Sequence, residues 1–285
     1  MKQIILSNEG VFPITKDKDG NLLANLPATG LNISGTIQGE GKLAGTTALF
    51  IRLASCNLRC IWELPNGKLS LCDTPYASFH ANNNIPTNVR EVVNLVRANL
   101  GILKHIVITG GEPLIQKAEL ANLAALLKEE TGVHITLETN GTLFDHDVAK
   151  NIDLFSISPK LVNSNPNFNK LKTLGLEPSG PLIFHAEKRV NLQALQSYLD
   201  VCNATDKAFQ FEFVVAKPEE ATEIEETYLN YLTGWKSDDI ILMPLGANRE
   251  ELLQTSKLVM EMAIRRGWRY TPRIHIELFG SKAGV

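Results

Sequence analysis

Short apolar runs alternate along the chain with stretches whose apolar residues recur at helical spacing. From residue 48 onward, six runs rich in branched and aromatic side chains predict β-strands. They cover 48–54, 105–109, 133–138, 153–158, 208–215 and 239–245. A last run, 272–278, alternates between apolar and polar residues and predicts a strand at the edge of the sheet.

The segments between these runs predict helices, because their apolar residues recur every three or four positions. They cover 88–100, 114–130 and 249–266, with weaker patterns over 190–200 and 218–232. Asn248 and Gly267 are typical of the start and stop of the longest one. Strand–helix alternation favours parallel strands joined by crossovers. Periodicity leaves open an open doubly wound sheet and an incomplete barrel, and in both the ligands gather at the carboxyl ends of the strands.

Two segments are predicted to lie outside this alternation. Residues 1–33 form an N-terminal extension, in which the turn signal at 16–21 lies between short apolar segments and suggests a hairpin. The polar stretch 76–88 predicts a loop that is placed to act as a lid or a cover. We therefore expect one core domain over 34–285.

The composition and charge of the chain exclude several classes of protein. With 285 residues, 44% of them hydrophobic and 21% charged, the chain is neither disordered nor collagen-like. A net charge of −3 provides no basic field for a nucleic acid. No apolar run is long enough to span a bilayer, and the N-terminus lacks the cleavage site of a signal peptide. The sequence thus predicts a cytoplasmic protein with no membrane partner, in which structural disulfides are unusual.

Three of the four cysteines follow the first core strand. Three residues separate Cys56 from Cys60, and eleven separate Cys60 from Cys72. A structural zinc ion normally has four protein ligands, and the nearest histidine is His80. An iron–sulfur cluster held by three thiolates would instead leave one iron open to another ligand. A zinc site completed by His80 and unliganded thiols are the alternatives, and Cys202 is expected to be a buried apolar residue.

The second core strand runs directly into Gly110, Gly111, Glu112 and Pro113. Glycines at a strand end allow close approach to the backbone, and a carboxylate beside them can accept hydrogen bonds from an amine. Together with the cysteines, this segment resembles the radical S-adenosyl-L-methionine (SAM) superfamily. The resemblance implies a 4Fe–4S cluster on the three cysteines, SAM chelating its open iron, and contacts from Gly111 and Glu112 to the methionine amino group. Radical chemistry then belongs to the cofactor.

Four further segments narrow the resemblance: 36–41 (Thr-Ile-Gln-Gly-Glu-Gly) with Arg52, 72–74 (Cys-Asp-Thr), 138–142 (Glu-Thr-Asn-Gly-Thr) and 158–160 (Ser-Pro-Lys). Together they resemble the 7-carboxy-7-deazaguanine synthase family, whose members convert 6-carboxy-5,6,7,8-tetrahydropterin to 7-carboxy-7-deazaguanine with loss of ammonia, on the route to queuosine and other deazapurines. The resemblance implies an incomplete (β/α)₆ barrel of the radical SAM type. It covers 34–76, 105–114, 134–142 and 153–160, and 270–281 only faintly.

The resemblance also implies roles for individual residues. Contacts to the substrate are expected from Ile37, Gln38, Gly39, Arg52, Thr109, Glu138 and His275, and contacts to SAM from Ser158, Pro159 and Lys160. Arg52 would bind the substrate carboxylate through its guanidinium fork, and Glu40, Arg52 and Glu138 are the expected catalytic groups. Thr74 would coordinate Mg²⁺, which also binds the substrate.

Each of these roles has a simpler alternative. The 36–41 segment can be a turn in solvent, and Arg52 can face outward from a half-buried strand. Asp73 or Thr74 can cap a helix. His275 can be structural, as we expect for His105, His134, His146 and His185, and polar residues at strand ends can be caps.

One departure from the family concerns the cysteine spacing. Members usually have two residues where this chain has eleven, so 61–71 is expected to be an inserted hairpin with an Asn-Gly turn. Such an insertion lengthens the loop without moving its ends, so the cluster can survive it. The hairpin is a candidate contact for a reductase or a neighbouring subunit.

The resemblance further implies a homodimer and a one-electron reductase that the sequence does not identify. Two rival functions remain open at this point. One is a radical SAM activase that acts on a protein partner, and the other is a zinc-binding module without catalysis.

Overall fold

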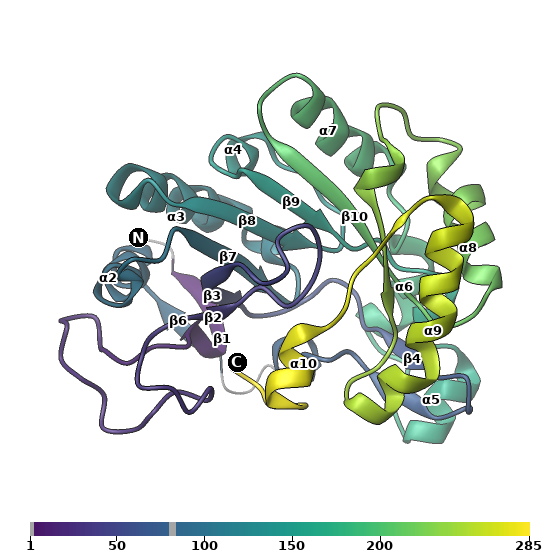
Figure 1. The fold of residues 1–285 in the computed structure, drawn as a ribbon, viewed down its shortest axis with the longest axis horizontal. Helices are drawn as coiled ribbons and strands as arrows, with labels where there is room; N and C mark the ends of the chain where they lie inside the picture. Colours follow the sequence, from purple (N-terminus) through teal and green to yellow (C-terminus); the bar gives the residue numbers. More distant parts are fainter. Residues whose placement is uncertain (1–2, 80–83) are drawn as a thin grey trace.

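A sheet of mostly parallel strands forms the centre of the computed structural model, which describes residues 3–79 and 84–285 (Figure 1). Its strands are β1 (Ile4–Phe12), β2 (Thr36–Ile37), β3 (Thr47–Leu53), β6 (Ile85–Thr87), β7 (His105–Gly110), β8 (His134–Thr139), β9 (Leu154–Ile157), β10 (Ala208–Val215), β11 (Ile240–Pro244) and β12 (Arg269–Tyr270). Their order across the sheet is β12-β11-β10-β9-β8-β7-β3-β1-β6, with β2 paired to β3.

The six predicted core strands are confirmed as β3, β7, β8, β9, β10 and β11. Each of them pairs in parallel with the next one along the chain. Parallel neighbours in chain order are what successive strand–helix crossovers produce. The order of strands ends at β12 on one side and at β6 on the other. These two edge strands do not pair with each other, so the barrel is incomplete.

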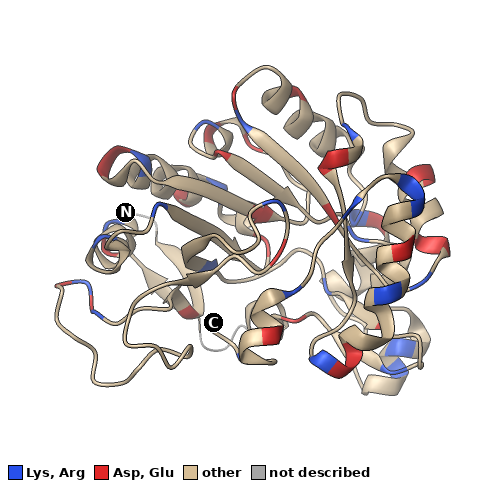
Figure 2. Cartoon of the chain, in the orientation of Figure 1, with Lys and Arg blue, Asp and Glu red and all other residues tan. Residues whose placement is uncertain are grey.

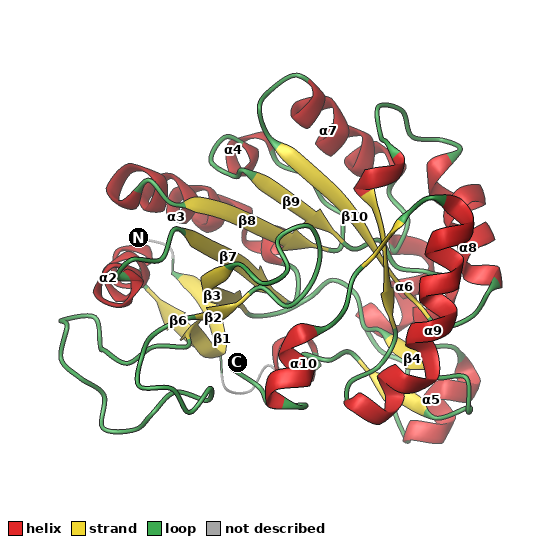
Figure 3. Cartoon of the chain, viewed as in Figure 1, coloured by secondary structure: helices red, strands yellow, loops and turns green. Residues whose placement is uncertain are grey.

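Most helices lie outside this sheet, where they cover the apolar residues of the strands (Figure 3). The helices are α1 (Pro75–Ser78), α2 (Val89–Leu100), α3 (Lys117–Thr131), α4 (His146–Ala149), α5 (Phe168–Leu174), α6 (Pro181–Lys188), α7 (Leu192–Asn203), α8 (Glu219–Ile224), α9 (Arg249–Arg266) and α10 (Ile274–Phe279). The short helices α1 and α10 lie instead at the carboxyl ends of the strands. The five helical segments predicted from the sequence are confirmed by α2, α3, α9, α7 and α8, and the last of these continues as a π-helical turn over Glu225–Leu229.

The ends of these helices follow the expected capping chemistry. The Asn248 side chain accepts a hydrogen bond from the Glu251 backbone N–H at 3.0 Å, and Asn88 does the same for Arg90 at 2.9 Å. Gly267 ends α9 with φ of 64°, a left-handed conformation that favours glycine. Helix α9 therefore begins and ends where its sequence predicts.

The prediction of an edge strand over 272–278 is wrong. Residues 274–279 form the short helix α10, and the edge of the sheet is the two-residue strand β12. Pro272 has no N–H for a strand ladder, and the Ile274 N–H donates to the Gly39 carbonyl at 3.0 Å instead. The chain thus leaves the sheet and crosses toward the loop after β2.

The N-terminal segment begins inside the main sheet. Strand β1 is antiparallel to both β3 and β6, and its residues Ile4, Leu6 and Val11 are buried in the core. The suggested hairpin after it is reduced to one bridge, between Lys16 and Leu22, whose turn is held by the Asp17 carboxylate.

The polar stretch 76–88, expected to be a loop, contains most of α1 and the whole of β6. His80, the expected fourth ligand of a zinc site, lies outside the described residues, as do 81–83. The lid that we expected over 76–88 therefore falls partly on residues that the structure does not describe.

Residues 61–71 form an antiparallel hairpin of β4 (Ile61–Glu63) and β5 (Leu69–Leu71). Its buried side chains Trp62 and Leu64 pack with Ala216 and Leu245, at the carboxyl ends of β10 and β11. The hairpin is therefore part of the wall above the sheet, beside the cysteines that precede and follow it.

Charged residues of both signs are interspersed along the outer helices (Figure 2). Over the described part of the chain, no helix combines the length and the apolar character needed to cross a bilayer.

Candidate active site

A cavity of about 550 Å³ lies at the carboxyl ends of the parallel strands. It brings together all the predicted site residues except Glu112 and Pro159. Those that line it are Ile37, Gln38, Gly39, Glu40, Arg52, Cys56, Cys60, Cys72, Thr74, Thr109, Gly111, Glu138, Ser158, Lys160 and His275. The end of the chain, residues 280–285, lines it too. This is the edge at which a barrel of this kind collects its chemistry.

The three cysteines share one wall of this cavity. Gly111 is required there, because a methyl group at that position would collide with the Ser55 carbonyl and lie 2.9 Å from Cys56 Cβ. The glycine therefore allows the end of β7 to pack against the cysteine loop. The Asn140 amide holds the same loop by donating to Asn57 Oδ1 at 2.8 Å.

The thiols fit a cluster better than a single metal ion. Across residues 3–79 and 84–285, no three histidine, cysteine, aspartate or glutamate side chains are placed around one ion. Burial raises the pKa of Cys56 to about 12, and it raises the pKa of Cys60 and of Cys72 as well. A bound metal deprotonates its thiol ligands, so a cluster would hold all three as thiolates in spite of this rise. Thiols that share one wall without surrounding one ion suit an iron–sulfur cluster, whose irons each take a different ligand.

Glu112, which the resemblance expects to contact the methionine amino group of SAM, does not line the cavity. Its carboxylate is completely buried, accepts from the backbone N–H groups of Leu114 at 3.0 Å and Asn140 at 2.7 Å, and accepts from Thr139 Oγ1 at 2.9 Å. Burial raises the pKa of Glu112, and these donors act against the rise. Glu112 therefore joins the end of β7 to the end of β8 through buried hydrogen bonds.

On the next strand end, Ser158 and Lys160 line the cavity whereas Pro159 does not. Lys160 Nζ donates to Ser158 Oγ at 2.6 Å, and the Lys160 carbonyl accepts from Tyr228 at 2.8 Å. The expected contact of Pro159 with SAM stays a prediction, and the residue lies between two that line the cavity.

The loop after β2 brings Gln38 and Glu40 to the opposite wall. Gln38 Nε2 donates to Glu138 Oε1 at 2.9 Å, so the loop is connected to the end of β8. Burial raises the pKa of Glu138, while hydrogen bonds from Gln38 and Thr109 lower it. Gly39 is required here because the His275 ring occupies the place of a side chain.

Arg52 lines the cavity and has a partner that the sequence did not reveal. Its Nε donates to Glu9 Oε2 at 2.6 Å, and its guanidinium lies 5.2 Å from the Phe12 ring centre and 5.9 Å from that of Tyr76. Arg52 interrupts an apolar strand, whereas Glu9 follows Ser7 and Asn8 in β1, so the sequence marked the arginine but not its partner. Among the described residues, no side chain accepts a hydrogen bond from the Nη groups of Arg52.

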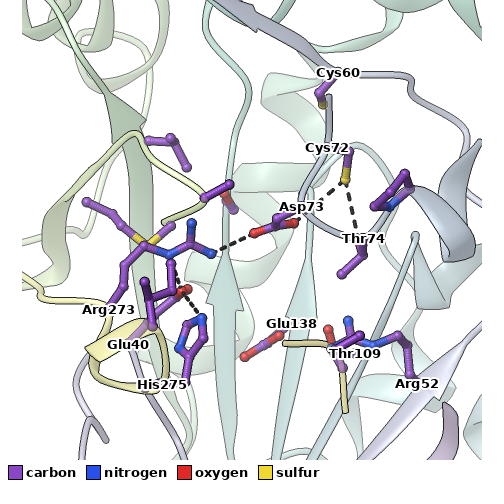
Figure 4. A pocket seen from close by; sticks show the side chains of 18 of the residues that line it. Glu40, Arg52, Cys60, Cys72, Asp73, Thr74, Thr109, Glu138, Arg273 and His275 are labelled. Atoms are coloured by element: carbon purple, nitrogen blue, oxygen red, sulfur yellow. Dashed lines mark hydrogen bonds and ion pairs between the residues drawn. The ribbon is translucent and has the colours of Figure 1, made fainter. Parts of the chain in front are cut away.

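A second buried arginine was also missed. Arg273 donates through Nε to Glu40 at 2.7 Å, through Nη2 to Asp73 at 2.6 Å and through Nη1 to the Gly246 carbonyl at 2.6 Å (Figure 4). Although burial acts to raise it, the pKa of Asp73 falls to about 2 beside this guanidinium. His275 Nε2 lies 3.6 Å from Glu40. Arg273 therefore connects the cysteine loop to the loop after β2.

Thr74 stands next to Asp73, between the cysteines and the substrate side (Figure 4). It occupies the N-cap position of α1, but its side chain makes no capping hydrogen bond. Its hydroxyl lies 3.4 Å from Cys72 Sγ. The hydroxyl is therefore not used as a helix cap, which was the simpler alternative for this residue.

Glu212 is the third missed residue of the cavity. It is the one charged residue of β10, whose other residues are apolar except for Gln210, and this is the same kind of signal as Arg52 in β3. It lines the cavity and is 6% exposed.

Comparison with known proteins defines first the class of enzyme. The profile of the radical SAM superfamily matches residues 53–164, which include the three clustered cysteines and the segment around Gly111. Members of this superfamily carry a 4Fe–4S cluster and SAM, and the partial barrel and the cysteine wall fit both. The chain is a radical SAM enzyme.

Its relatives then define the particular family. The 7-carboxy-7-deazaguanine synthase of Rhodopirellula baltica is 36% identical over 248 residues, which are 87% of this chain and 85% of that protein. The one from Halobacterium salinarum is 35% identical over 279 residues, 93% and 96% of the two chains. The chain belongs to the 7-carboxy-7-deazaguanine synthase family. This membership leaves no place for a zinc-binding module or a protein activase.

The fold agrees with a solved structure. The crystal structure of QueE from Escherichia coli superposes with a TM-score of 0.54, covers 92% of this chain and 93% of its own, and is 24% identical in sequence.

Proposed function

We propose that this enzyme converts 6-carboxy-5,6,7,8-tetrahydropterin to 7-carboxy-7-deazaguanine with release of ammonia. The observation that carries the proposal is a single cavity in which the cysteine wall faces Arg52 and Glu138. A cationic fork suits the substrate carboxylate, and a buried carboxylate suits the amino and ring N–H groups of a pterin.

The cofactor side of the cavity is formed by residues that the resemblance assigned. Cys56, Cys60 and Cys72 would hold the 4Fe–4S cluster, and Gly111 with the Ser158–Lys160 pair would contact SAM. When bound, the two groups supply the radical that removes a hydrogen atom from the carbon bearing the substrate carboxylate. The chain's own part is to hold the reactants close together and to exclude water.

The substrate side is built around Arg52. Its Nε is held by Glu9 and its face lies against aromatic rings, so the guanidinium is fixed with its Nη groups available to a carboxylate. Gln38 and Thr109 orient Glu138 toward the pterin edge. Ile37, Gly39 and His275 complete the wall.

Thr74 holds Mg²⁺ in this proposal. One hydroxyl is a poor magnesium site by itself, so the substrate oxygens supply further ligands to this hard cation. The proposal is supported by the position of Thr74 in the cavity and by its unused capping position. Mg²⁺ would hold and polarise the substrate during the rearrangement.

The wider setting of the enzyme is also proposed. We expect a homodimer in the cytoplasm that receives single electrons from a reductase. Residues 34–285 form the radical SAM core and 1–33 precede it, with β1 as part of the same sheet. The β4–β5 hairpin lies beside the cysteines and is the expected contact for the reductase or the second subunit.

Anaerobic reconstitution tests the function. The iron-loaded protein, reduced in the presence of SAM, Mg²⁺ and the carboxylated pterin, is expected to form 7-carboxy-7-deazaguanine and ammonia, with 5′-deoxyadenosine from those events in which the hydrogen atom is not returned. Cys60→Ala should lose iron and product together. Cys202→Ala is the control, because Cys202 is buried at the end of α7 and does not line the cavity. Iron-loaded protein that cleaves SAM without forming the deazapurine would refute the proposal.

A further inference from the structure

Glu212 is a buried acid in the cavity that has no counter-ion. Among the described residues, no lysine, arginine or histidine nitrogen lies within 4.0 Å of its carboxylate. Its Oε2 accepts one hydrogen bond, from Gln210 Nε2 at 3.3 Å, and no described group bonds to Oε1. A buried carboxylate without a cation is costly, so this side chain is driven to the neutral, protonated form.

The groups that face Glu212 strengthen this tendency. Glu138 on β8 and Glu40 after β2 are the acidic ones, while Lys160 after β9 and Arg273 before α10 are the basic ones. Lys160 donates to Ser158, and Arg273 is committed to Glu40 and Asp73. Burial raises the pKa of Glu212 well above its ordinary value, and Glu40 and Glu138 raise it further.

Gln210 fixes the orientation of this acid. Its side-chain nitrogen donates to Ser156 Oγ at 2.9 Å as well as to Glu212, and its oxygen accepts from the Lys42 backbone N–H at 2.7 Å. Because Gln210 is held at both ends, Oε2 of Glu212 stays on the Gln210 side. The proton is therefore best placed on Oε1, the oxygen that is open to a molecule in the cavity.

The proposed reaction has a step that needs such a proton. The substrate differs from the product by one molecule of ammonia, so the whole conversion is redox-neutral: the hydrogen atom removed at the start is returned to the ring, and no oxidant is needed. When the carbon–nitrogen bond breaks, its electron pair goes to nitrogen, which must be protonated to leave as ammonia. The aromatic product then forms by loss of a proton from the remaining ring, and this proton restores the acid.

We propose that Glu212 is the general acid that protonates the departing nitrogen and recovers its proton from the ring. The inference rests on the proposed function and adds a catalytic residue to it. The other side chains are less suited to this task. Glu138 accepts hydrogen bonds from Gln38 and Thr109, Glu40 is ion-paired with Arg273, and burial keeps His275 neutral by lowering its pKa.

The test is Glu212→Gln in the reconstituted enzyme. The amide keeps the size and the hydrogen bond of the acid but has no proton to give. We expect ammonia and deazapurine formation to fall by about 10²- to 10⁴-fold, while the 5′-deoxyadenosine burst in a single turnover stays within about threefold of wild type. In the wild type, kcat should decline at high pH as Glu212 ionises, and ammonia release should be slower in deuterium oxide. The Glu212→Asp variant should turn over more slowly than wild type, and its kcat should still decline at high pH.

Glu220→Gln is the matched control, because Glu220 is also buried and has a raised pKa but lies outside the cavity. It should keep wild-type rates. If Glu212→Gln releases ammonia at the wild-type rate, or loses 5′-deoxyadenosine in parallel with product, the inference is wrong and the proposed function stands. If the wild type itself forms no deazapurine, both the inference on Glu212 and the proposed function are wrong. Should the glutamine variant not fold, a wild type without the solvent isotope effect and without the alkaline decline would overturn the inference.

Discussion

At the scale of single residues, Arg273 connects several segments of the site through its hydrogen bonds. It joins Glu40, Asp73 and the Gly246 carbonyl, which belong to three separate loops. The arginine is 8% exposed. Burying this charge is tolerable only because two carboxylates share its planar fork. The network fixes the distance between the cysteine loop and the loop that faces the substrate.

Replacing Arg273 by lysine should therefore uncouple SAM cleavage from deazapurine formation. An ammonium group is a single point of charge and cannot hold both carboxylates in the geometry of the fork. A misplacement of about 1 Å costs roughly 10²-fold in rate. We expect kcat/KM to fall by about that factor, and the ratio of 5′-deoxyadenosine to deazapurine to rise above the wild-type value. Both products are quantified by chromatography from the same reaction.

Arg97→Lys is the control for this substitution. Arg97 is an exposed arginine on α2 that pairs with Glu130, and exposed pairs contribute little. An Arg273→Lys enzyme with the wild-type product ratio would show that the fork does not couple the two loops.

At the scale of elements, the loop after β2 is held by contacts with distant segments in addition to its own backbone hydrogen bonds. The Gly41 N–H donates to Thr271 Oγ1 at 2.7 Å, and Lys42 Nζ donates to the Phe209 carbonyl at 2.8 Å. The Gly39 carbonyl accepts from Ile274. These contacts come from β10 and from the segment between β12 and α10. The position of Glu40 therefore depends on where α9 ends, because α9 leads into β12.

Gly267→Ala tests how much the stop of α9 contributes to stability. The residue has φ of +64° and no atom within 4 Å of an added methyl group, so the cost is backbone strain alone. We expect the free energy of unfolding to fall by about 1 kcal/mol, as measured by urea denaturation. Gly267→Asn should lose less, because asparagine adopts the left-handed conformation more readily. Equal losses in the two variants would contradict this explanation.

At the scale of the whole molecule, local patterns predicted the elements but not the contacts between them. Strand and helix positions follow from periodicity, because each element must bury one face. The segment 272–278 was misread because its alternation also suits a short helix that buries Ile276 and exposes Leu278. Only the missing N–H of Pro272 and the contact to Gly39 decide between the two, and that contact spans more than 230 residues.

The same limit applies to the cavity. The cysteines and the strand-end residues share motifs that are local in sequence, so most of them could be named in advance. Glu9, Arg273 and Glu212 could not, because each acts on a partner from a distant segment. Only Glu212 carried a local signal, as the one charged residue of the mostly apolar strand β10. Glu112 shows the reverse, since its motif is local but its hydrogen bonds turn it away from the cavity.

The free energy of unfolding should depend on pH through buried histidines and through buried carboxyl groups. Burial lowers the pKa of His105 to about 4 and that of His185 to about 3. Burial also raises the pKa of Glu112, Glu138 and Glu220. The unfolded chain binds more protons at its histidines below pH 6.5, which destabilises the fold in acid. It releases more protons from these carboxyls above pH 4.5, which destabilises the fold as pH rises.

The His105→Gln variant tests how much one buried histidine contributes to the pH dependence of stability. The His105 ring bonds to Thr136 through Nε2 at 2.8 Å, and its Nδ1 is buried without a partner, so a second proton would place a charge in the core. Because its folded pKa lies below its unfolded pKa, His105 makes stability fall as pH drops from 6.5 toward 4. The variant should lose that dependence, and its unfolding free energy should change less steeply by up to about 1.4 kcal/mol per pH unit. Urea denaturation of the iron-free, reduced protein measures both slopes, and His146→Gln, at an exposed position, should keep the wild-type slope. Parallel slopes for His105→Gln and wild type would mean that His105 is protonated in the folded protein.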